Sequence, residues 1–492
     1  MLSLLLAWLS LTPALWAQSE TKLTASDGGV FDEFGISVSL SGDVALVGAD
    51  GDDDSGSAYV FRRVGGAWVE EAKLTPSDGA AGDIFGQSVS LSGDVALVGA
   101  RWDDDNGDDS GSAYVFRRVD GAWVEEAKLT ASDGAAFDGF GYALSVSEAV
   151  ALVGAFRHDD NGLDSGSAYV FRRVDGAWVE EAELTPSDGT AEDNFGFSVS
   201  VSGDVALVGA YLDDDNGDGS GSAYVFRRVG DAWVEEAKLT ASDGAGHDRF
   251  GFSVSASGDV ALVGAREDDD NGLDSGSAYV FRRMGGAWVE EANLTPTDGG
   301  ELDRFGQSVS VSGDVALVGA IQDNGLFIGS AYVFQRVDGA WVEEAKLTAS
   351  DGAELDFLGF SVSVSGNAAL AGARGDDDNG PDSGSAYVFS DVVTTAGESP
   401  PVVLPKQIDL TPNYPNPFTT TTILRFRLTT AADVRLEVYD RLGRRVATLV
   451  DASRSAGWHE ATFDAAGLTS GVYTYRLTAD GATQQRTMLL LD

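Results

Sequence analysis

"FGQSVSLSGDVALVGARWDDDNGDDSGSAYVFRRVDGAWVEEAKLT", residues 85–130, is one complete copy of a unit that recurs along this chain of 492 residues. Its first part, "FGQSVSLSG", alternates serine with aliphatic residues, a period of two that is typical of a strand. "DVALVGA" is a continuous apolar run, as expected for a strand buried on both faces. "GSAYVFRRV" and the more polar "AWVEEAKLT" follow, so one copy predicts four consecutive strands.

A Phe-Gly pair marks the same point in each copy. The seven pairs are separated by 51 residues, then by 55 four times, then by 53, and they begin at Phe34, Phe85, Phe140, Phe195, Phe250, Phe305 and, as Leu-Gly, at Leu358. All-strand units of this length favour propeller blades over helical solenoids. Glycine-containing pairs such as Asp120-Gly121 predict two-residue hairpin turns between the third and fourth strands. We therefore predict an all-β protein whose residues 18–393 form a seven-bladed β-propeller.

The two ends of the predicted propeller complement each other. The seventh copy ends at "GSAYVFSDVV", residues 384–393, with no fourth strand after it. Near the N-terminus, "ETKLTASDG" repeats the fourth-strand sequence "EAKLTASDG". We expect residues 20–27 to form the fourth strand of blade seven, because this would close the ring and remove an exposed sheet edge.

The acidic residues gather in the long loops. In a four-stranded blade, the first-to-second and third-to-fourth connections lie on one face of the disc, and the other two connections lie on the opposite face. Here the first face receives only tight turns, whereas the opposite face receives two acidic loops, 75–84 and 101–111 in the second unit. We call the opposite face the loop face and expect it to carry any binding function.

These loops raise the question of a metal ion. Calcium prefers oxygen ligands, and linear calcium loops place acids on alternate residues. Such an ion would be held by aspartates of the second, third, fourth, fifth and seventh units, namely Asp103, Asp105, Asp159, Asp160, Asp213, Asp215, Asp268, Asp270, Asp376 and Asp378. An ion shared between two loops would add Asp78 or Asp83. The alternative is a solvated turn, because Asp, Asn and Gly form turns without any metal.

Other aromatic and histidine residues predict structure rather than chemistry. Phe34 and its copies begin the innermost strand, which favours packing between blades over ligand stacking. Trp68 and its copies follow a hairpin turn on the outermost strand, where packing is favoured over a sugar platform. His158 and His247 each stand alone in a loop, without a partner in the sequence that suggests catalysis.

Composition narrows the classes of partner. The formal net charge is −47, from 79 Asp and Glu against 32 Lys and Arg, which disfavours nucleic acid and anionic lipid. The chain has no cysteine, which excludes disulfides and thiolate metal sites. Residues 1–17 contain an apolar run of the length found in a signal peptide, and no other segment is apolar enough to span a bilayer. We expect a monomer without a transmembrane segment in the mature chain.

The C-terminal part does not contain the repeated unit. Residues 394–408 form a Pro-rich linker, expected to be extended. Residues 409–492 contain short strand patterns with turn punctuation, which predict a small Ig-like β-sandwich.

The repeated "FGxSV…ALVGA…GSAYVF" pattern resembles the FG-GAP repeats of integrin α-subunit propellers and of bacterial surface proteins. Integrin-like repeats keep calcium between the first and second strands, where this chain has only Ser-Gly-Asp, so no calcium ligand is transferred from that family. Residues 409–492 resemble the type A sorting domain of the type IX secretion system, through "NYPNPF" at 413–418, Gly443-Arg444-Arg445, and 468–475. This resemblance implies export through that machinery, with the protein secreted or attached to the outer-membrane surface.

We therefore expect a secreted or cell-surface binding or adhesion protein that uses its acidic loop face to meet a protein or glycan ligand. The alternatives are an exported glycan-active enzyme and a structural surface-layer component. Propeller enzymes usually break repeat symmetry to build a catalytic cluster, whereas these repeats are nearly identical, so we expect no catalytic residue and no enzyme activity. Calcium is the only cofactor expected.

Overall fold

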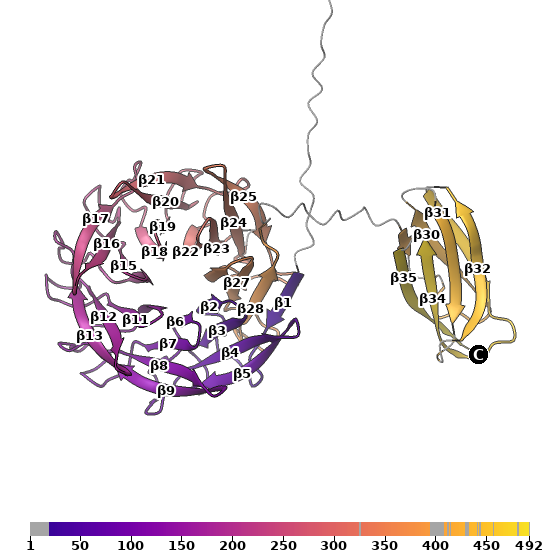
Figure 1. Cartoon of the computed structure of the whole chain (residues 1–492), viewed down its shortest axis with the longest axis horizontal. Coiled ribbons are helices and arrows are strands. Elements are labelled where there is room, and N and C mark those ends of the chain that lie inside the picture. Colours follow the sequence, from indigo (N-terminus) through magenta and orange to yellow (C-terminus); the bar gives the residue numbers. More distant parts are fainter. Residues whose placement is uncertain are drawn as a thin grey trace, which may run out of the picture. The chain divides into compact units, whose positions relative to one another are not determined.

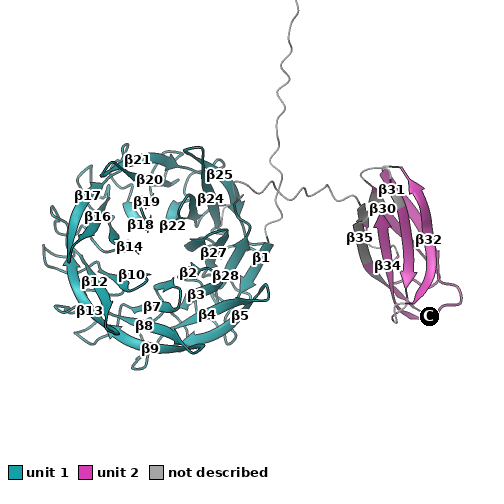
Figure 2. Ribbon diagram, in the orientation of Figure 1, with its two compact units in different colours: residues 1–393 teal, residues 394–492 magenta. Residues whose placement is uncertain are grey.

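The computed structural model describes residues 19–323, 326–393 and 408–491, the last range with gaps at 411–412, 414, 429–431, 440, 442–443, 456 and 480–481. The expected signal peptide and residues 394–407 of the expected linker lie outside the described residues, as does Gly443. The chain divides into two compact units, residues 1–393 and 394–492 (Figure 2).

The first unit is a ring of seven four-stranded antiparallel sheets, which we number as blades 1 to 7 (Figure 1). Blade 1 consists of β2 (Val38–Ser41), β3 (Val44–Ala49), β4 (Ser57–Val64) and β5 (Ala67–Leu74), and blade 2 of β6 (Val89–Ser92), β7 (Val95–Ala100), β8 (Ser112–Val119) and β9 (Ala122–Leu129). Blade 3 consists of β10 (Ala143–Ser147), β11 (Val150–Ala155), β12 (Ser167–Val174) and β13 (Ala177–Leu184), and blade 4 of β14 (Ser198–Ser202), β15 (Val205–Ala210), β16 (Ser222–Val229) and β17 (Ala232–Leu239).

The remaining blades follow the same order. Blade 5 consists of β18 (Phe250–Ser257), β19 (Val260–Ala265), β20 (Ser277–Met284) and β21 (Ala287–Leu294), and blade 6 of β22 (Phe305–Ser312), β23 (Val315–Ala320), β24 (Ser330–Val337) and β25 (Ala340–Leu347). Blade 7 consists of β26 (Ser361–Ser365), β27 (Ala368–Ala373), β28 (Ser385–Ser390) and β1 (Ser19–Leu23). The predicted seven-bladed all-β fold is confirmed.

Burial within a blade follows the sequence pattern. In blade 2, the valine and leucine of β6 are buried while its serines are half-buried, and all six residues of β7 are buried. The first five residues of β8 are buried as well, whereas β9 is largely half-exposed. The hairpin between β8 and β9 turns at Asp120 and Gly121, whose positive φ angles of 51° and 88° match a type I′ turn.

The N-terminal strand completes the last blade. β1 pairs antiparallel with β28 from Ser19 opposite Ser390 to Leu23 opposite Ala386. Leu23 is 3% exposed and packs in a core cluster with Phe34 of the neighbouring blade 1. The first and last strands of the propeller therefore lie side by side, and the ring is closed by pairing rather than by an unpaired edge.

Neighbouring blades are packed through their innermost strands. Phe85 is fully buried and meets Tyr114 and Phe116 edge-on, in a cluster that also contains Leu46 of the preceding blade. This confirms the expected packing role of the Phe-Gly phenylalanines. The blades also approach closely at glycines, since a Cβ added at Gly154 would lie 2.0 Å from the carbonyl oxygen of Gly196 in the next blade.

The outer strands are joined by polar contacts. Glu126 of β9 forms ion pairs with Arg117 of its own blade and with Arg173 of the next, at 3.1 and 2.6 Å. Trp178 of the next blade donates its indole N–H to the same carboxylate at 3.0 Å. Trp123, Trp233, Trp288 and Trp341 make the equivalent contact in other blades. These tryptophans therefore connect blades, as the sequence favoured, instead of presenting sugar platforms.

The second unit contains two antiparallel sheets, with strand orders β29-β30-β33 and β32-β31-β34-β35. The strands are β29 (Ile408–Leu410), β30 (Thr421–Leu428), β31 (Ala432–Tyr439), β32 (Arg445–Arg454), β33 (Gly457–Asp464), β34 (Gly471–Ala479) and β35 (Ala482–Leu490). One core cluster joins Phe426 and Phe463 of the first sheet to Leu436 and Leu477 of the second, so the two sheets pack as a small β-sandwich. Within the described residues of the whole chain, no helix is long and apolar enough to cross a membrane.

Candidate functional site

On the loop face, a buried tyrosine anchors carboxylates from two loops. In blade 2, the Tyr114 hydroxyl lies 2.8 Å from a carboxylate oxygen of Asp78 and 2.8 Å from one of Asp103, and it donates to one of them. Asp103 is 4% exposed and also accepts a hydrogen bond from Ser112 at 2.9 Å. The two loops that the sequence suggested could share an ion are therefore adjacent.

A lysine ammonium occupies the space between these carboxylates. Lys128, from the end of β9, lies 3.0 Å from Asp78, 2.9 Å from Asp103 and 2.6 Å from Asp105. We call this arrangement of tyrosine, aspartates and lysine a rim cluster. The same ammonium lies 2.7–2.9 Å from the buried aspartate in four other blades, as Lys22, Lys73, Lys238 and Lys346.

The lysine supplies each of these rim clusters with a cation of its own. Burial alone would lower the pKa of Lys128, but its hydrogen bonds to Asp105, Asp103 and Asp78 raise that pKa well above its ordinary value. Burial would raise the pKa of Asp78, but the hydrogen bonds from Lys128 and Tyr114 lower it. A metal ion entering this cluster would have to displace a fully charged lysine, so in five blades the ammonium fills the place of a cation.

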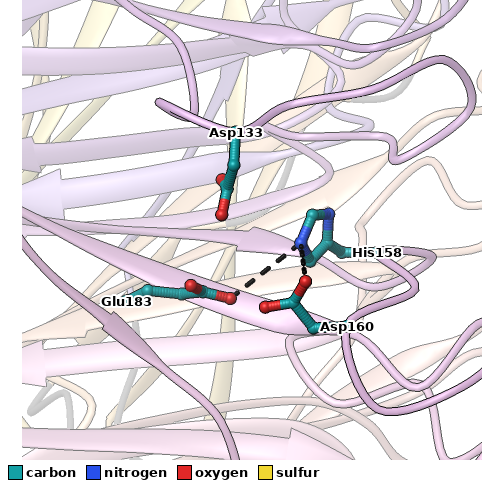
Figure 3. A group of neighbouring side chains, drawn as sticks. All are labelled: Asp133, His158, Asp160 and Glu183. Carbon is teal, nitrogen blue, oxygen red and sulfur yellow. Dashed lines mark ion pairs between the residues drawn. The ribbon is translucent and has the colours of Figure 1, made fainter.

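Blade 3 departs from this pattern at two positions that face each other in the cluster. His158 stands where blade 2 has Asp103, and Glu183 stands where blade 2 has Lys128. His158 is 5% exposed; its Nδ1 lies 3.0 Å from Asp138, and its Nε2 lies 3.2 Å from Asp160 and 4.0 Å from Glu183 (Figure 3). His158 was expected to stand alone, and this is wrong, because its partners come from loops and a strand distant in sequence.

The blade 3 cluster combines nitrogen and oxygen donors. Ligand atoms of Asp133, His158, Asp160 and Glu183 all lie within 4.8 Å of one another, so this group could hold a metal ion. His158 Nε2 is buried and makes no well-aligned hydrogen bond among the described residues, although a carboxylate oxygen of Asp160 lies 3.2 Å away. The hydrogen bond to Asp138 raises the pKa of His158 to about 9 against the opposing effect of burial. Burial and the nearby Asp160 raise the pKa of Glu183.

Blade 5 also lacks the lysine, but it keeps the buried aspartate that blade 3 replaces with histidine. Asn293 occupies the lysine position and donates its amide N–H to Asp270 at 2.7 Å, while its side-chain oxygen is buried without a partner. Tyr279 contacts Asp243 and Asp268, as in the other blades. Burial raises the pKa of Asp268. Among the blades, this one holds its aspartates with neither lysine nor histidine in the described cluster.

The ten aspartates proposed for calcium fall into five environments. Asp103, Asp213, Asp268 and Asp376 are buried beside a tyrosine, and Asp105, Asp215 and Asp378 pair with a lysine at the surface. Asp270 meets Asn293, and Asp160 meets His158. Asp159 is exposed and accepts a hydrogen bond from the backbone of Asp164, away from the blade 3 cluster.

The integrin-type calcium position does not fit the residues present. In blade 2, β6 ends at Ser92 and β7 begins at Val95, so only Gly93 and Asp94 connect them. A two-residue turn cannot supply the six to eight oxygen ligands that calcium takes.

A second feature lies inside the rim clusters, around the centre of the loop face. Two positions in each blade, the residue after the Phe-Gly pair and the residue after the second strand, stand where the inner strands meet this face. Their side chains form a wall of rings across blades 3 to 5, half-buried except for the buried Phe156. In this wall, Tyr142, Phe156, Phe197, Tyr211 and Phe252 have neighbouring ring centroids 4.3–5.7 Å apart. We call these positions the inner ring.

Arginines lie over this aromatic wall. Arg266 is 3.9 Å from the centroid of Phe252, Arg374 is 4.3 Å from that of Phe360, and Arg101 is 5.2 Å from that of Tyr142. The Nε atoms of all three arginines are buried without a hydrogen-bond partner. Burial lowers the pKa of Arg101 and of Arg266. A cavity of about 540 Å³ opens here, with Arg266, Arg304 and Arg374 among its lining residues.

Two positions that vary between the copies could have indicated this cavity from the sequence, although the overall composition could not. The position after "ALVGA" and its counterpart "ALAGA" reads Asp, Arg, Phe, Tyr, Arg, Ile and Arg in blades 1 to 7, although the strand before it is almost unchanged. The position after Phe-Gly reads Ile, Gln, Tyr, Phe, Phe, Gln and, after Leu-Gly, Phe. Packing holds the other residues constant between copies, so divergence at two adjoining positions marks a surface free to serve recognition.

Comparisons with known proteins agree with this fold. The FG-GAP repeat family model matches residues 16–61, 68–116, 123–171, 178–226, 233–281, 288–334 and 341–389. The model of the secretion system C-terminal sorting domain matches residues 413–490. A search of curated proteins found no match.

Two solved structures are similar at low identity. One is PorZ, an essential bacterial surface component of the type-IX secretion system of Porphyromonas gingivalis, at 12% identity and a TM-score of 0.46, with 96% of this chain and 61% of PorZ covered. The other is a putative 6-phosphogluconolactonase from Bacteroides uniformis, at 12% identity and a TM-score of 0.45, with 68% and 90% covered. The chain thus spans less than two thirds of the length of PorZ.

Proposed function

The chain belongs to the FG-GAP repeat family and ends in a type IX sorting domain that directs export to the cell surface or beyond, and on this basis we propose that it acts there as a binding or adhesion module. Its ligand docks on the loop face. The expected partners are that ligand, a protein or a glycan, and the type IX secretion machinery, which meets the C-terminal sandwich.

The inner ring is the observation that carries this proposal. Seven nearly identical blades supply a rigid frame, and many of the inner-ring residues, which differ between copies, line one cavity on the loop face. Sites built from varied side chains on a constant frame are typical of repeat proteins that bind ligands. The acidic rim clusters lie farther out on the same face and give it much of its negative charge.

An exported enzyme is the weaker alternative. Glycoside hydrolysis needs two carboxyl groups placed across a bond, one of them free to transfer a proton. In five blades the described rim carboxylates pair with lysine and tyrosine, which favours structural use.

The proposal is tested by probing glycan and protein arrays with the labelled full chain. A variant carrying Phe197→Gln and Phe252→Gln imports the residue that blades 2 and 6 have at this position, and we expect it to lose most of the array signal. The control carries Asp120→Gly and Asp175→Gly on the opposite face, where blades 1 and 5 have glycine, and it should bind normally. Equal loss in both variants, or turnover of a bound glycan, would contradict a binding role for the loop face.

Cation binding is a second candidate function, favoured by ligand atoms of Asp133, His158, Asp160 and Glu183 that lie within 4.8 Å of one another. In blade 3, one imidazole and three carboxylates converge without a lysine between them. An imidazole nitrogen suits Zn²⁺ better than the Ca²⁺ expected from the acidic loops. We propose that this cluster, which would supply His158, Asp160, Glu183 and Asp133 as ligands, binds such an ion and fixes the two loops of blade 3.

Metal binding at blade 3 predicts a thermal shift that a matched variant removes. Saturating Zn²⁺ should raise the melting temperature of the wild-type chain by a few degrees, because an ion at 100 times its Kd stabilises by about 2.7 kcal/mol. The double variant His158→Asp and Glu183→Lys restores the cluster of blade 2 and should show no shift. Circular dichroism melting with and without EDTA measures both. Equal shifts in the two proteins would place the ion elsewhere.

A further inference from the structure

We propose that the cavity of the inner ring binds a carboxylate-bearing sugar, with arginines holding the carboxylate and the aromatic wall stacking on the sugar ring. This inference rests on the proposed binding function of the loop face and names the class of its ligand.

The charge of the inner ring is opposite to that of the rest of the chain. The chain has 79 acidic against 32 basic residues. The inner-ring positions, the residues that follow them and the residues before the Phe-Gly pairs hold three acids, Glu33, Asp50 and Glu267, against six arginines. The arginines are Arg101, Arg157, Arg249, Arg266, Arg304 and Arg374, of which Arg266, Arg304 and Arg374 line the cavity. A locally positive cavity inside a negative rim favours a compact anion that can enter the centre.

Part of this positive charge is already paired. Arg374 forms an ion pair with Glu33 at 2.7 Å, and Glu267 lies 3.1 Å from Arg266 and 3.3 Å from Arg249. Arg101 makes no ion pair within the part of the chain that the structure describes, and Arg157 only stacks on Phe156 there. Burial, and after it the negative charge of Glu33, raises the pKa of Asp50 to about 6. Of the three arginines that line the cavity, Arg304 makes no ion pair within the described residues, so one positive charge there remains to attract an anion.

The guanidinium groups have unused hydrogen-bonding capacity. The Nε atoms of Arg101, Arg266 and Arg374 are buried and unpartnered, which is costly for a charged donor. A guanidinium presents its donors in a fixed planar fork that fits the two oxygens of a carboxylate. These Nε atoms are covered by protein, so a ligand carboxylate would instead meet the terminal N–H groups of Arg266 and Arg374. Both arginines line the cavity, and their terminal groups are only partly used by Gln307, Glu267 and Glu33.

The aromatic wall selects for a ring-shaped ligand. Tyr142, Phe197, Tyr211 and Phe252 are half-buried, so each keeps part of its ring open to the cavity side instead of packing fully in the core. Their ring faces offer flat apolar surface next to the guanidinium groups. A cavity of about 540 Å³ falls in the range of small-molecule sites and is too small for a folded partner. An acidic sugar combines the ring, the size and the carboxylate.

The test is a calorimetric titration of the full chain with three acidic sugars, trigalacturonate, a hyaluronan tetrasaccharide and sialyllactose, each against its carboxyl methyl ester. We expect at least one acid to bind, and its ester to bind at least tenfold more weakly. Binding should also weaken with added salt, since the attraction is between charges.

Two variants locate the site. Arg266→Ile and Arg374→Tyr each import the residue that blade 6 or blade 4 has at that position, so the frame should fold unchanged. Each should weaken binding about tenfold or more, the range expected for losing a hydrogen bond to a charged group. The control Lys238→Asn imports the rim residue of blade 5 and should bind within about twofold of wild type.

The outcomes separate this inference from the proposed function. If none of the acids binds, or if acid and ester bind alike, the acidic-sugar inference is overturned. The proposed binding function would still hold in that case if the arrays identify a ligand that the variant with Phe197→Gln and Phe252→Gln no longer binds. If an acid binds but Lys238→Asn abolishes binding and Arg266→Ile does not, the ligand sits on the rim and the inference is wrong. Absence of any loop-face ligand on the arrays would remove the proposed function itself.

Discussion

A chain that begins at Thr24 is expected to lose most of the stability of the propeller relative to one that begins at Ser19. The five residues of β1 pair with β28, from Ser390 to Ala386, along the edge that does not pair with β27. They also supply Leu23, whose burial alone is worth about 2–5 kcal/mol by the cost of leucine-to-alanine changes, and Lys22, which pairs with three aspartates in the rim cluster of blade 7. We expect a loss exceeding about 5 kcal/mol, comparable to the total stability of many domains.

Urea unfolding followed by circular dichroism measures this loss. Both proteins lack residues 1–18, so the strand is the single difference between them. The shortened chain should unfold at much lower urea, with an edge of blade 7 left open to association. Superimposable unfolding curves would show that the ring does not depend on β1, and the closure described here would have no energetic consequence.

Gly154→Ala is expected to destabilise the propeller by about 3 kcal/mol. The added Cβ would lie 2.0 Å from the oxygen and 2.9 Å from the carbon of the Gly196 carbonyl, and both atoms are backbone. In an open structure the two blades could separate, but each blade of a closed ring is held by neighbours on both sides. Overpacking that cannot relax usually costs about 1–3 kcal/mol, and this position lies at the upper end.

Gly203→Glu is the matched control for this prediction. Gly203 has a φ of 59° and open space around its Cβ position, and blade 3 has Glu148 at the same place with a φ of 55°. This change should cost about 1 kcal/mol or less. The difference between the two midpoints in thermal or urea unfolding checks the argument. Similar losses in both variants would mean that the close approach of the blades does not limit stability.

The ring was predictable because the same pattern occurs seven times. A single apolar run such as "DVALVGA" is ambiguous between strand and helix, but its constant place between "FGQSVSLSG" and "GSAYVFRRV" removes that ambiguity. The strands β6 to β9 begin and end within four residues of the predicted segments. Local pattern and repetition therefore determine the architecture.

The rim clusters were only partly predictable. The acids of the two loops do meet, as Asp78 and Asp103 show at Tyr114. Lys128, however, comes from the end of a strand, and its position among them depends on the register of β8 and β9 and on the bulge between Val115 and Phe116. Acid-rich loops alone suggest a bound metal cation. The strand register shows instead that in five blades a lysine ammonium of the chain is the cation.

The histidine cluster and the inner ring were missed for a different reason. Both appear where one copy differs from the others, so they are found by comparing copies at a fixed position and not by asking which residues are chemically reactive. The exchange of Asp103 and Lys128 for His158 and Glu183 keeps opposite charges in place with their order reversed, which only the paired positions reveal.

The closing strand also determines how the propeller would respond to mechanical load. β28 is the last strand before the chain leaves the propeller, and it is paired along one side with β27 and along the other with β1. If the protein is held at the surface through its C-terminal end while a ligand pulls on the loop face, tension enters the propeller at Ser390. Because that residue pairs with Ala368 on one side and Ser19 on the other, two ladders must yield together before the propeller can be peeled open.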